Sequence, residues 1–337
     1  MLENKKILIT GGTGSLGRAL TKRLLAEKVD VIRIFSRNEN KQVTMQSEFN
    51  DDRLRFLIGD VRDLPRLERA LEGIDIVFHA AALKHVPIIE YNPFEAINTN
   101  VIGSRNVVEA CLSENVGTVV GVGTDKAVSP LNTYGATKLL MEKLFTTASN
   151  YLDKDKHKTK FVSLRYGNVL GSSGSVIPKF IQQIKANEKI TITDPDMTRF
   201  SITMDEALDF ILDSTMSGKG SEVFVPKLRA YKIDDVKVAL QELISNTGEE
   251  KIPVRQGEKF HETLINTDEM RTALESESKY MILQKEISDQ EIDKEYPGFR
   301  RITFSLLFSS TLYSLKVKSS IIAPLRLIDP TTLLFSN

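Results

Sequence analysis

The sequence predicts an α/β protein with a doubly wound parallel sheet and a smaller second α/β domain. Three observations support this prediction. Short apolar runs alternate with longer helical stretches, and these runs carry few polar residues, as strands buried on both faces do. A glycine-rich loop joins the first run to the first helix. Right-handed crossovers between such strands place helices on both faces of the sheet.

The predicted elements follow one another regularly up to residue 168. The apolar runs predict strands over residues 6–10, 31–35, 55–58, 75–79, 118–122 and 160–165. The spacing of apolar residues predicts helices over residues 15–27, 64–71, 93–114 and 134–149. Beyond residue 168 the pattern loosens, and we expect helices over residues 176–187, 205–217 and 232–247 and a short strand over residues 190–192.

We expect these elements to form two domains and a tail. The first domain covers residues 1–168, with residues 202–226 returning to it, and the second covers residues 169–201 and 227–300. Residues 301–337 form an atypical tail, rich in Ser, Leu and Ile, with Asp329 as its single acid. Two interpretations of the tail stay open: a segment for self-association or membrane contact, and the product of a shifted reading frame.

Composition excludes several classes of function. The 337 residues include 45 Lys+Arg and 45 Asp+Glu, so the chain lacks the basic excess that nucleic-acid binding needs. Its single cysteine, Cys111, excludes an internal disulfide, and its four histidines lack the spacing of a metal site. Because we find neither a signal-peptide pattern nor an apolar stretch long enough to cross a bilayer, we expect a cytoplasmic protein without stable membrane insertion.

The loop at residues 10–17, TGGTGSLG, has the pattern of a dinucleotide-binding turn. Gly11, Gly14 and Gly17 permit a tight turn, close approach of the backbone to a pyrophosphate, and close packing of the helix on the strand. The N-terminus of the next helix would offer N–H groups and positive dipole to the phosphates. A purely structural turn is the alternative, but the strand–loop–helix context favours a Rossmann nucleotide site.

The end of the second strand indicates which dinucleotide binds. An Asp or Glu at this point holds the ribose 2′-hydroxyl of NAD, whereas a nearby Arg accommodates the 2′-phosphate of NADP. This chain has Ser36, Arg37 and Lys41 here, which favours NADP, although Arg37 could be an ordinary surface arginine. Asp60, after the next strand, is a candidate partner for the adenine amine, and a turn-forming aspartate is the rival interpretation.

Tyr134 and Lys138 lie four residues apart, on one face of a predicted helix. A nearby ammonium lowers the pKa of a tyrosine, so we expect Lys138 to make Tyr134 a usable base for a hydroxyl group near neutral pH. Upstream, Thr124, Asp125 and Lys126 follow a strand at the edge where doubly wound folds carry out chemistry. A desolvated Lys126 could act as a base and Asp125 as an acid; the alternative is a solvated surface turn.

With these motifs assembled, the chain resembles the extended short-chain dehydrogenase/reductases. More narrowly, it resembles the soluble UDP-N-acetylglucosamine 4,6-dehydratases that invert C5 and feed pseudaminic-acid-type glycans. The similarity covers most of residues 5–265, and its most specific stretches are AAALKHVP and TDKA. These stretches favour a catalytic Asp125 and Lys126 over a surface turn.

The resemblance implies a catalytic cycle with no net redox change. Tyr134, with Thr124 and Lys138, would remove the O4 proton while the C4 hydride passes to NADP. Lys126 would take the C5 proton, and Asp125 would protonate the departing C6 hydroxyl. The hydride would return to C6, and C5 would be protonated on the opposite face, giving UDP-2-acetamido-2,6-dideoxy-β-L-arabino-hex-4-ulose.

The resemblance also implies the binding residues and a homo-oligomer. The cofactor would contact Gly11, Thr13, Gly14, Ser15, Leu16, Gly17, Ser36, Arg37, Lys41, Asp60, Val61, Ala80, Ala81, Lys84, Asn100, Tyr134, Lys138 and Tyr166. The UDP-sugar would contact Lys84, Asn168, Val176, Arg199, Arg255 and Glu258, although Arg199 could instead pair with Asp194 or Asp196.

Three features depart from the family pattern: Gly123 stands where Ser is usual, Ser173 where Arg or Asn is common, and the ending after Gly298 differs. Rival functions are a UDP-sugar 4-epimerase, which has no need of the Asp125–Lys126 pair, and a non-catalytic NADP-binding regulator. A dehydratase that retains the C5 configuration is not distinguished by reasoning from the residues.

Overall fold

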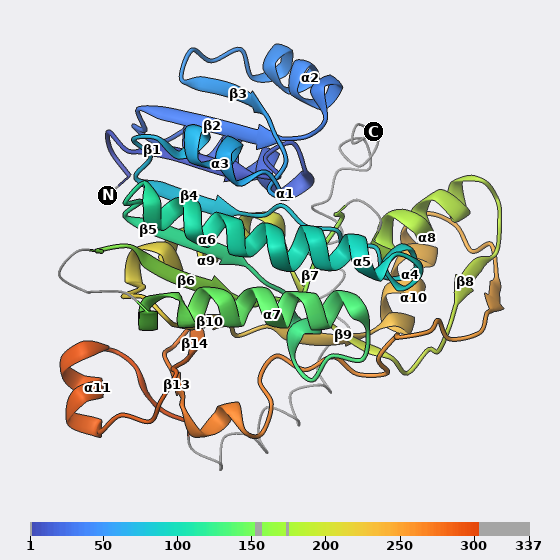
Figure 1. The fold of residues 1–337 in the computed structure, drawn as a ribbon. Coiled ribbons are helices and arrows are strands. Elements are labelled where there is room, and N and C mark those ends of the chain that lie inside the picture. The colour runs from blue at the N-terminus through green and yellow to red at the C-terminus, as the bar shows by residue number, and fades with distance from the viewer. Residues whose placement is uncertain (1, 152–156, 173–174, 303–337) are drawn as a thin grey trace.

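A ten-stranded sheet with helices on both faces forms the centre of the molecule (Figure 1). The structure is a computed structural model that describes residues 2–151, 157–172 and 175–302. The parallel strands are β1 (Lys6–Thr10), β2 (Val31–Ser36), β3 (Leu54–Ile58), β4 (Ile76–His79), β5 (Thr118–Val122), β6 (Lys160–Leu164) and β10 (Val223–Pro226). Three further strands, β13 (Ala273–Glu275), β14 (Lys279–Ile282) and β15 (Arg300–Arg301), are antiparallel to their neighbours.

The strand order is β15-β13-β14-β10-β6-β5-β4-β1-β2-β3. The order reverses at β1, from which the chain first builds outward to β3 and then returns to β4 on the other side. This is the arrangement of a doubly wound sheet, and the predicted fold class is confirmed. Ligands of such sheets bind beyond the carboxyl ends of the strands near the reversal point.

Two layers of helix cover the sheet. Helices α1 (Ser15–Leu25) and α9 (Met204–Ser217) pack on one face, and α3 (Leu64–Leu71), α6 (Gly103–Ser113) and α7 (Thr133–Thr147) pack on the other. Strand β1 shows why its sequence is apolar throughout: Ile7 and Ile9 enter the first core and Leu8 enters the second. Each such buried side chain contributes about 1.5–3 kcal/mol to folding.

The single helix predicted for residues 93–114 is three consecutive helical segments. Helix α5 (Pro93–Ala96) leads into a π-helix, η1 (Ile97–Ile102), before α6 begins at Gly103. The Gly103 N–H donates to the carbonyl of Asn98, five residues earlier, so the turn is wider than in an α-helix. Three further α-helices of the described residues were not predicted, because their sequences are polar or short: α2 (Glu39–Phe49), α4 (Val86–Tyr91) and α11 (Asp289–Glu295).

A smaller α/β part lies at one end of the sheet (Figure 1). It contains helices α8 (Val176–Lys185) and α10 (Ile233–Leu243), the strands β7 (Asn168–Val169), β9 (Thr198–Ile202) and β11 (Arg229–Lys232), and the pair β8 (Ile190–Ile192) and β12 (Glu249–Lys251). A separate apolar cluster holds α8, α10 and β8 together. Residues 227–300 were predicted to belong to this part as a whole, whereas β13, β14 and β15 extend the large sheet.

Candidate active site

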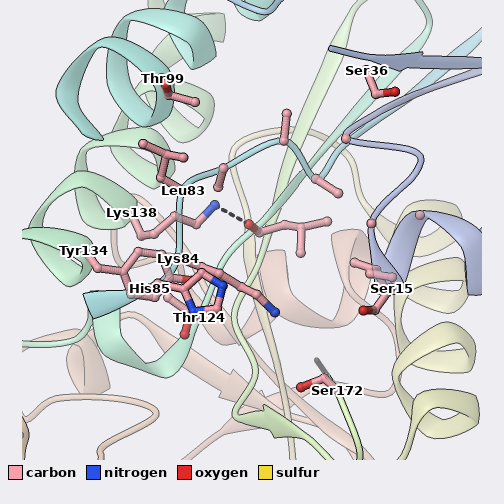
Figure 2. A pocket seen from close by; sticks show the side chains of 18 of the residues that line it. Ser15, Ser36, Leu83, Lys84, His85, Thr99, Thr124, Tyr134, Lys138 and Ser172 are labelled. Carbon is pink, nitrogen blue, oxygen red and sulfur yellow. Dashed lines mark hydrogen bonds between the residues drawn. The ribbon is translucent and has the colours of Figure 1, made fainter. Parts of the chain in front are cut away.

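A cavity of about 770 Å³ opens at the carboxyl ends of the parallel strands (Figure 2). Its wall includes most of the residues predicted for the cofactor and for catalysis: Gly11, Thr13, Gly14, Ser15, Leu16, Gly17, Ser36, Arg37, Lys41, Asp60, Val61, Ala80, Ala81, Lys84, Thr124, Lys126, Tyr134, Lys138 and Tyr166. Asn100 and Asp125 lie behind this wall. The fold therefore gathers residues from the ends of six parallel strands, β1 to β6, around one space.

The glycine-rich loop needs its glycines for two physical reasons. Gly11 has a φ of +67°, and a side chain there would come within 2.8 Å of the backbone of Ala81. A side chain at Gly17 would come within 2.5 Å of Gly12, so only glycine lets helix α1 pack this close to the loop. Helix α1 has no side-chain cap at its N-terminus, where Gly14 precedes Ser15. Its first N–H groups are thus suited to phosphate oxygens.

At the end of β2, the side chains differ in their contacts with other protein groups. The Ser36 hydroxyl accepts a hydrogen bond from Gln42 Nε2 at 3.0 Å, whereas Arg37 is half exposed and lies 3.8 Å from Asp60. Asp60 accepts hydrogen bonds from the backbone N–H and the guanidinium of Arg62 at 2.7–3.0 Å. Burial would raise the pKa of Asp60, but these bonds lower it on balance. Asp60 is therefore a turn-forming carboxylate, and its contact with adenine remains a prediction.

Helix α7 carries the Tyr134–Lys138 pair, and Asn132 caps the helix by accepting from the Gly135 N–H at 2.8 Å. Tyr134 and Lys138 both reach the cavity beside Thr124 (Figure 2). The side chain of Thr124 is hydrogen-bonded to that of Tyr134. Lys138 Nζ, however, donates to the carbonyl of Val122 at 2.6 Å.

Lys138 was expected to lower the pKa of Tyr134, but its charge is not among the causes that set this pKa in the structure. Burial raises the pKa of Tyr134, and the charge that partly offsets this effect belongs to Lys126. Burial lowers the pKa of Lys138 to about 7, although the charge of Glu142 acts in the other direction. The cation whose charge lowers the pKa of the phenol is thus the lysine that follows β5, not the one on the same helix face.

Three side-chain oxygens surround the amine of Lys126. Its Nζ is 3.1 Å from Asp125 Oδ1, 3.4 Å from Glu262 Oε1 and 3.2 Å from Asn168 Oδ1. Burial would lower the pKa of Lys126, but the charges of Asp125, Glu262 and Tyr134 raise it on balance. The surrounding charges therefore favour the ammonium form of Lys126 over the neutral amine, and its role as a base remains a prediction.

Glu262 was not predicted as a site residue. It is the last residue of the stretch QGEKFHE at residues 256–262, but nothing in the spacing links it to residues 124–126. The fold brings it there by pairing the segment around His261 with β9, where Thr198 Oγ1 and His261 Nδ1 are 2.8 Å apart. Only the tertiary structure identifies this contact.

Asn100, predicted to contact the cofactor, is occupied by protein groups. Its side chain bonds both the N–H and the carbonyl of Leu83, at 2.8 and 2.9 Å, and the hydroxyl of Thr137 at 3.0 Å. The widened π-helical turn carries this residue inward. Asn100 thereby ties the loop of Lys84 to helix α7, and it is 1% exposed. Lys84 itself lines the cavity, and burial lowers its pKa.

A second cavity of about 220 Å³ lies in the smaller part and shares Asn168 with the first. It is lined by four more of the predicted substrate residues, Val176, Arg199, Arg255 and Glu258. Arg199 pairs with Glu258 at 3.2 Å, whereas Asp196 pairs with Lys232 at 2.7 Å. The alternative partners considered for Arg199, Asp194 and Asp196, are thus not the ones it has.

Gly123 allows close contact between β5 and β6. Its N–H donates to the carbonyl of Leu164 at 2.7 Å, and a Cβ atom at this position would stand 2.2 Å from the same oxygen. A serine here would force the backbone to shift. The other two departures from the family pattern, Ser173 and most of the tail, lie outside the described residues.

Among the residues that the structure describes, no group of His, Cys, Asp and Glu could hold a metal ion. No helix in the same ranges is long and apolar enough to cross a membrane.

A doubly wound sheet with a Tyr-x-x-x-Lys helix facing a dinucleotide loop defines an extended short-chain dehydrogenase/reductase. Residues 7–285 match the family model described as polysaccharide biosynthesis protein. The chain belongs to this family.

Relatives of known name support this assignment. A UDP-N-acetylglucosamine 4,6-dehydratase (inverting) from Campylobacter jejuni is 46% identical over 84% of this chain and 84% of its own. A protein named UDP-glucose 4-epimerase from Rickettsia felis is 44% identical over 81% of each chain. The X-ray structure of Pen from Bacillus thuringiensis is 40% identical and aligns with a TM-score of 0.83 over 90% of this chain and 92% of that one.

Proposed function

We propose that the protein catalyses the NADP-dependent 4,6-dehydration of UDP-N-acetylglucosamine with inversion at C5. The observation that carries this proposal is the contact of buried Asp125 with Lys126, which lines the same cavity as Tyr134 and Lys138. Epimerisation at C4 needs one acid–base group at O4, whereas elimination needs a second pair, one group for C5 and one for the C6 oxygen. The site contains both sets.

The cavity fits a dinucleotide. The tight loop at Gly11, which any side chain would block, and the uncapped start of α1 suit a pyrophosphate. Arg37 and Lys41 line the same cavity at the end of β2, which supports NADP over NAD. When bound, the nicotinamide would supply the hydride chemistry, taking hydride from C4 and returning it to C6.

The protein's own residues would move the protons. Tyr134 would take the O4 proton, with Thr124 in hydrogen-bond contact with the phenol. Lys126 Nζ and Asp125 Oδ1 lie 3.1 Å apart, and the ion pair carries one proton that either group could hold. Transfer of that proton from Nζ to the carboxylate gives an amine and a carboxylic acid, the forms needed to remove the C5 proton and to protonate the C6 hydroxyl.

The second cavity would hold the UDP part of the substrate. Arg199 and Arg255 line it, and arginine suits phosphate because its donors form a rigid fork. Asn168 stands where the two cavities meet and accepts from Lys126, which would place the sugar against the catalytic residues.

The proposal is tested by NMR of purified protein incubated with UDP-N-acetylglucosamine in deuterated water. Loss of water, a new C6 methyl group and deuterium at C5 are expected, and the coupling of C5 reports its configuration. A C4 epimer without a methyl group would favour the second candidate, a UDP-sugar 4-epimerase. The similarity to the Rickettsia felis protein named UDP-glucose 4-epimerase supports this candidate. Bound cofactor without turnover would favour a regulator. Self-association stays a prediction that light scattering tests.

A further inference from the structure

Glu262 is a buried carboxylate with an incomplete set of partners. Its side chain is 4% exposed, and Oε1 lies 3.4 Å from Lys126 Nζ. Its other oxygen, Oε2, accepts no hydrogen bond, and it lies 3.7 Å from the ammonium of Lys259. That ammonium donates instead to the carbonyl of Val128 at 2.5 Å. Leaving a carboxylate oxygen unpaired in a buried place costs free energy, so a purely structural ion pair would be expected to satisfy it.

Asp125 repeats this pattern on the other side of Lys126. Its side chain is fully buried, and its Oδ2 has no hydrogen-bond partner. Its Oδ1 accepts hydrogen bonds from Thr124 Oγ1 at 2.9 Å and from Lys126 Nζ at 3.1 Å. Two buried carboxylates thus share one lysine. The other titratable groups whose charges act on this lysine or on its carboxylates are Tyr134, Tyr231 and Lys259.

The proton balance of elimination shows why one carboxylate is not enough. The C5 proton moves to Lys126 Nζ, and its electron pair forms the C5–C6 double bond. The C6–O bond breaks as the oxygen takes the proton of Asp125 and leaves as water. At the start of this step Asp125 is a neutral acid, so it offers little charge to the ammonium that begins to form. A second anion is required for that task.

We propose that Glu262 is a positioning residue that acts through Lys126 as the counter-ion of the ammonium formed during elimination. This inference rests on the proposed function. Glu262 would stay ionised throughout the cycle, hold Nζ toward the cavity and make Lys126 a stronger base toward C5. Asp125 would then be free to deliver its proton.

The test compares Glu262→Gln, which keeps the shape and removes the charge, with Glu262→Asp, which keeps the charge. We expect Glu262→Gln to lower kcat by about 10- to 100-fold with little change in KM, because a base without its counter-ion loses part of its catalytic effect. The acid limb of the kcat profile should move to lower pH, because the anion no longer favours the ammonium. Glu262→Asp should restore much of the lost rate.

Glu222→Gln is the matched control, since Glu222 is another buried carboxylate and is bonded to the loop at Gly220, away from Lys126. It should affect stability without moving the pH profile. If Glu262→Gln behaves in the same way, or keeps wild-type kcat, the inference is overturned.

A readout without turnover separates this inference from the proposed function. Lysines methylated with ¹³C can be titrated by NMR, and the signal of Lys126 is the one that is lost in Lys126→Arg. The titration of Lys126 should move to lower pH in Glu262→Gln but not in Glu222→Gln. An unmoved titration overturns the role of Glu262. Wild-type protein that gives no methyl product overturns the proposed function instead.

Discussion

Two buried clusters of charge follow neighbouring strands, and they differ in how completely their polar atoms are paired. After β6, Arg165 is fully buried and donates to both oxygens of Glu142, to both oxygens of Glu269 and to the carbonyl of Leu264, at 2.6–3.1 Å. After β5, Lys126 keeps a side chain that is 20% exposed to the cavity.

The comparison separates charge that holds the fold from charge that is available for chemistry. Arginine remains protonated under all conditions met by proteins, and a saturated cluster has no atom left for a ligand. Lysine can lose its proton, and one oxygen of Asp125 and one of Glu262 remain without a hydrogen bond. Helix α7 connects the two clusters, because it carries Lys138 at the cavity and Glu142 one turn later.

The largest effect is expected from removing Lys126. Lys126→Ala should lower the rate of elimination by at least about 100-fold, because it removes the amine that is paired with Asp125 and proposed to take the C5 proton. NMR of product formation measures the loss, and isothermal titration calorimetry with NADP should give wild-type affinity. Turnover at the wild-type rate would contradict the assignment of Lys126.

Removal of Arg165 should instead act on stability. Arg165→Met leaves Glu142 and Glu269 buried without their partner, and breaking a buried pair in this way costs about 3–5 kcal/mol. Urea unfolding followed by circular dichroism measures the change in the free energy of unfolding. A loss below about 1 kcal/mol would mean that the two clusters do not differ as proposed.

Gly123 lies between the clusters, next to Thr124 and bonded to the residue before Arg165. Gly123→Ser should destabilise the protein by about 1–3 kcal/mol, because its Cβ would meet the Leu164 carbonyl and the strands would have to separate. The unfolding midpoint in urea tests this expectation. An unchanged midpoint with higher activity would show that the strands adapt and that the serine hydroxyl serves the site.

The smallest effect concerns a third buried polar group, His79. It lies between Thr10 Oγ1 at 2.8 Å and Ser104 Oγ at 2.9 Å, and burial, together with the charge of Lys138, lowers its pKa from 6.5 to about 3. Because only the unfolded chain binds this proton below pH 6.5, folding stability should fall as the pH drops from about 6.5 toward 3.

Unfolding free energies measured between pH 4 and 7 test this pH dependence. The variant His79→Gln, which cannot titrate, should show a shallower decline than the wild type. Equal slopes for the two proteins would assign the decline to other groups.

The parts of the molecule that depend on local sequence were predictable. The apolar runs placed the six strands from β1 to β6 within a residue, and the loop at Gly11 was recognised because its strand and helix are adjacent in the chain. The helix predicted for residues 93–114 was wrong in detail, because the spacing of apolar residues did not reveal the π-helical turn that ends at Gly103, where a Cβ would come within 2.6 Å of Val61.

The sequence by itself therefore determined the doubly wound sheet and the glycine-rich loop, since hydrophobic periodicity and short spacings are local properties. The spacing of Tyr134 and Lys138 and the family resemblance at Asp125 and Lys126 predicted the catalytic pairs, whose roles remain predictions. Only the tertiary structure decided the charge state of Lys126, the presence of Glu262 beside it and the use of Asn100 as an internal clamp. The physical reason is that pKa values and hydrogen-bond partners depend on burial and on charges a few ångströms away, and these neighbours come from distant parts of the chain.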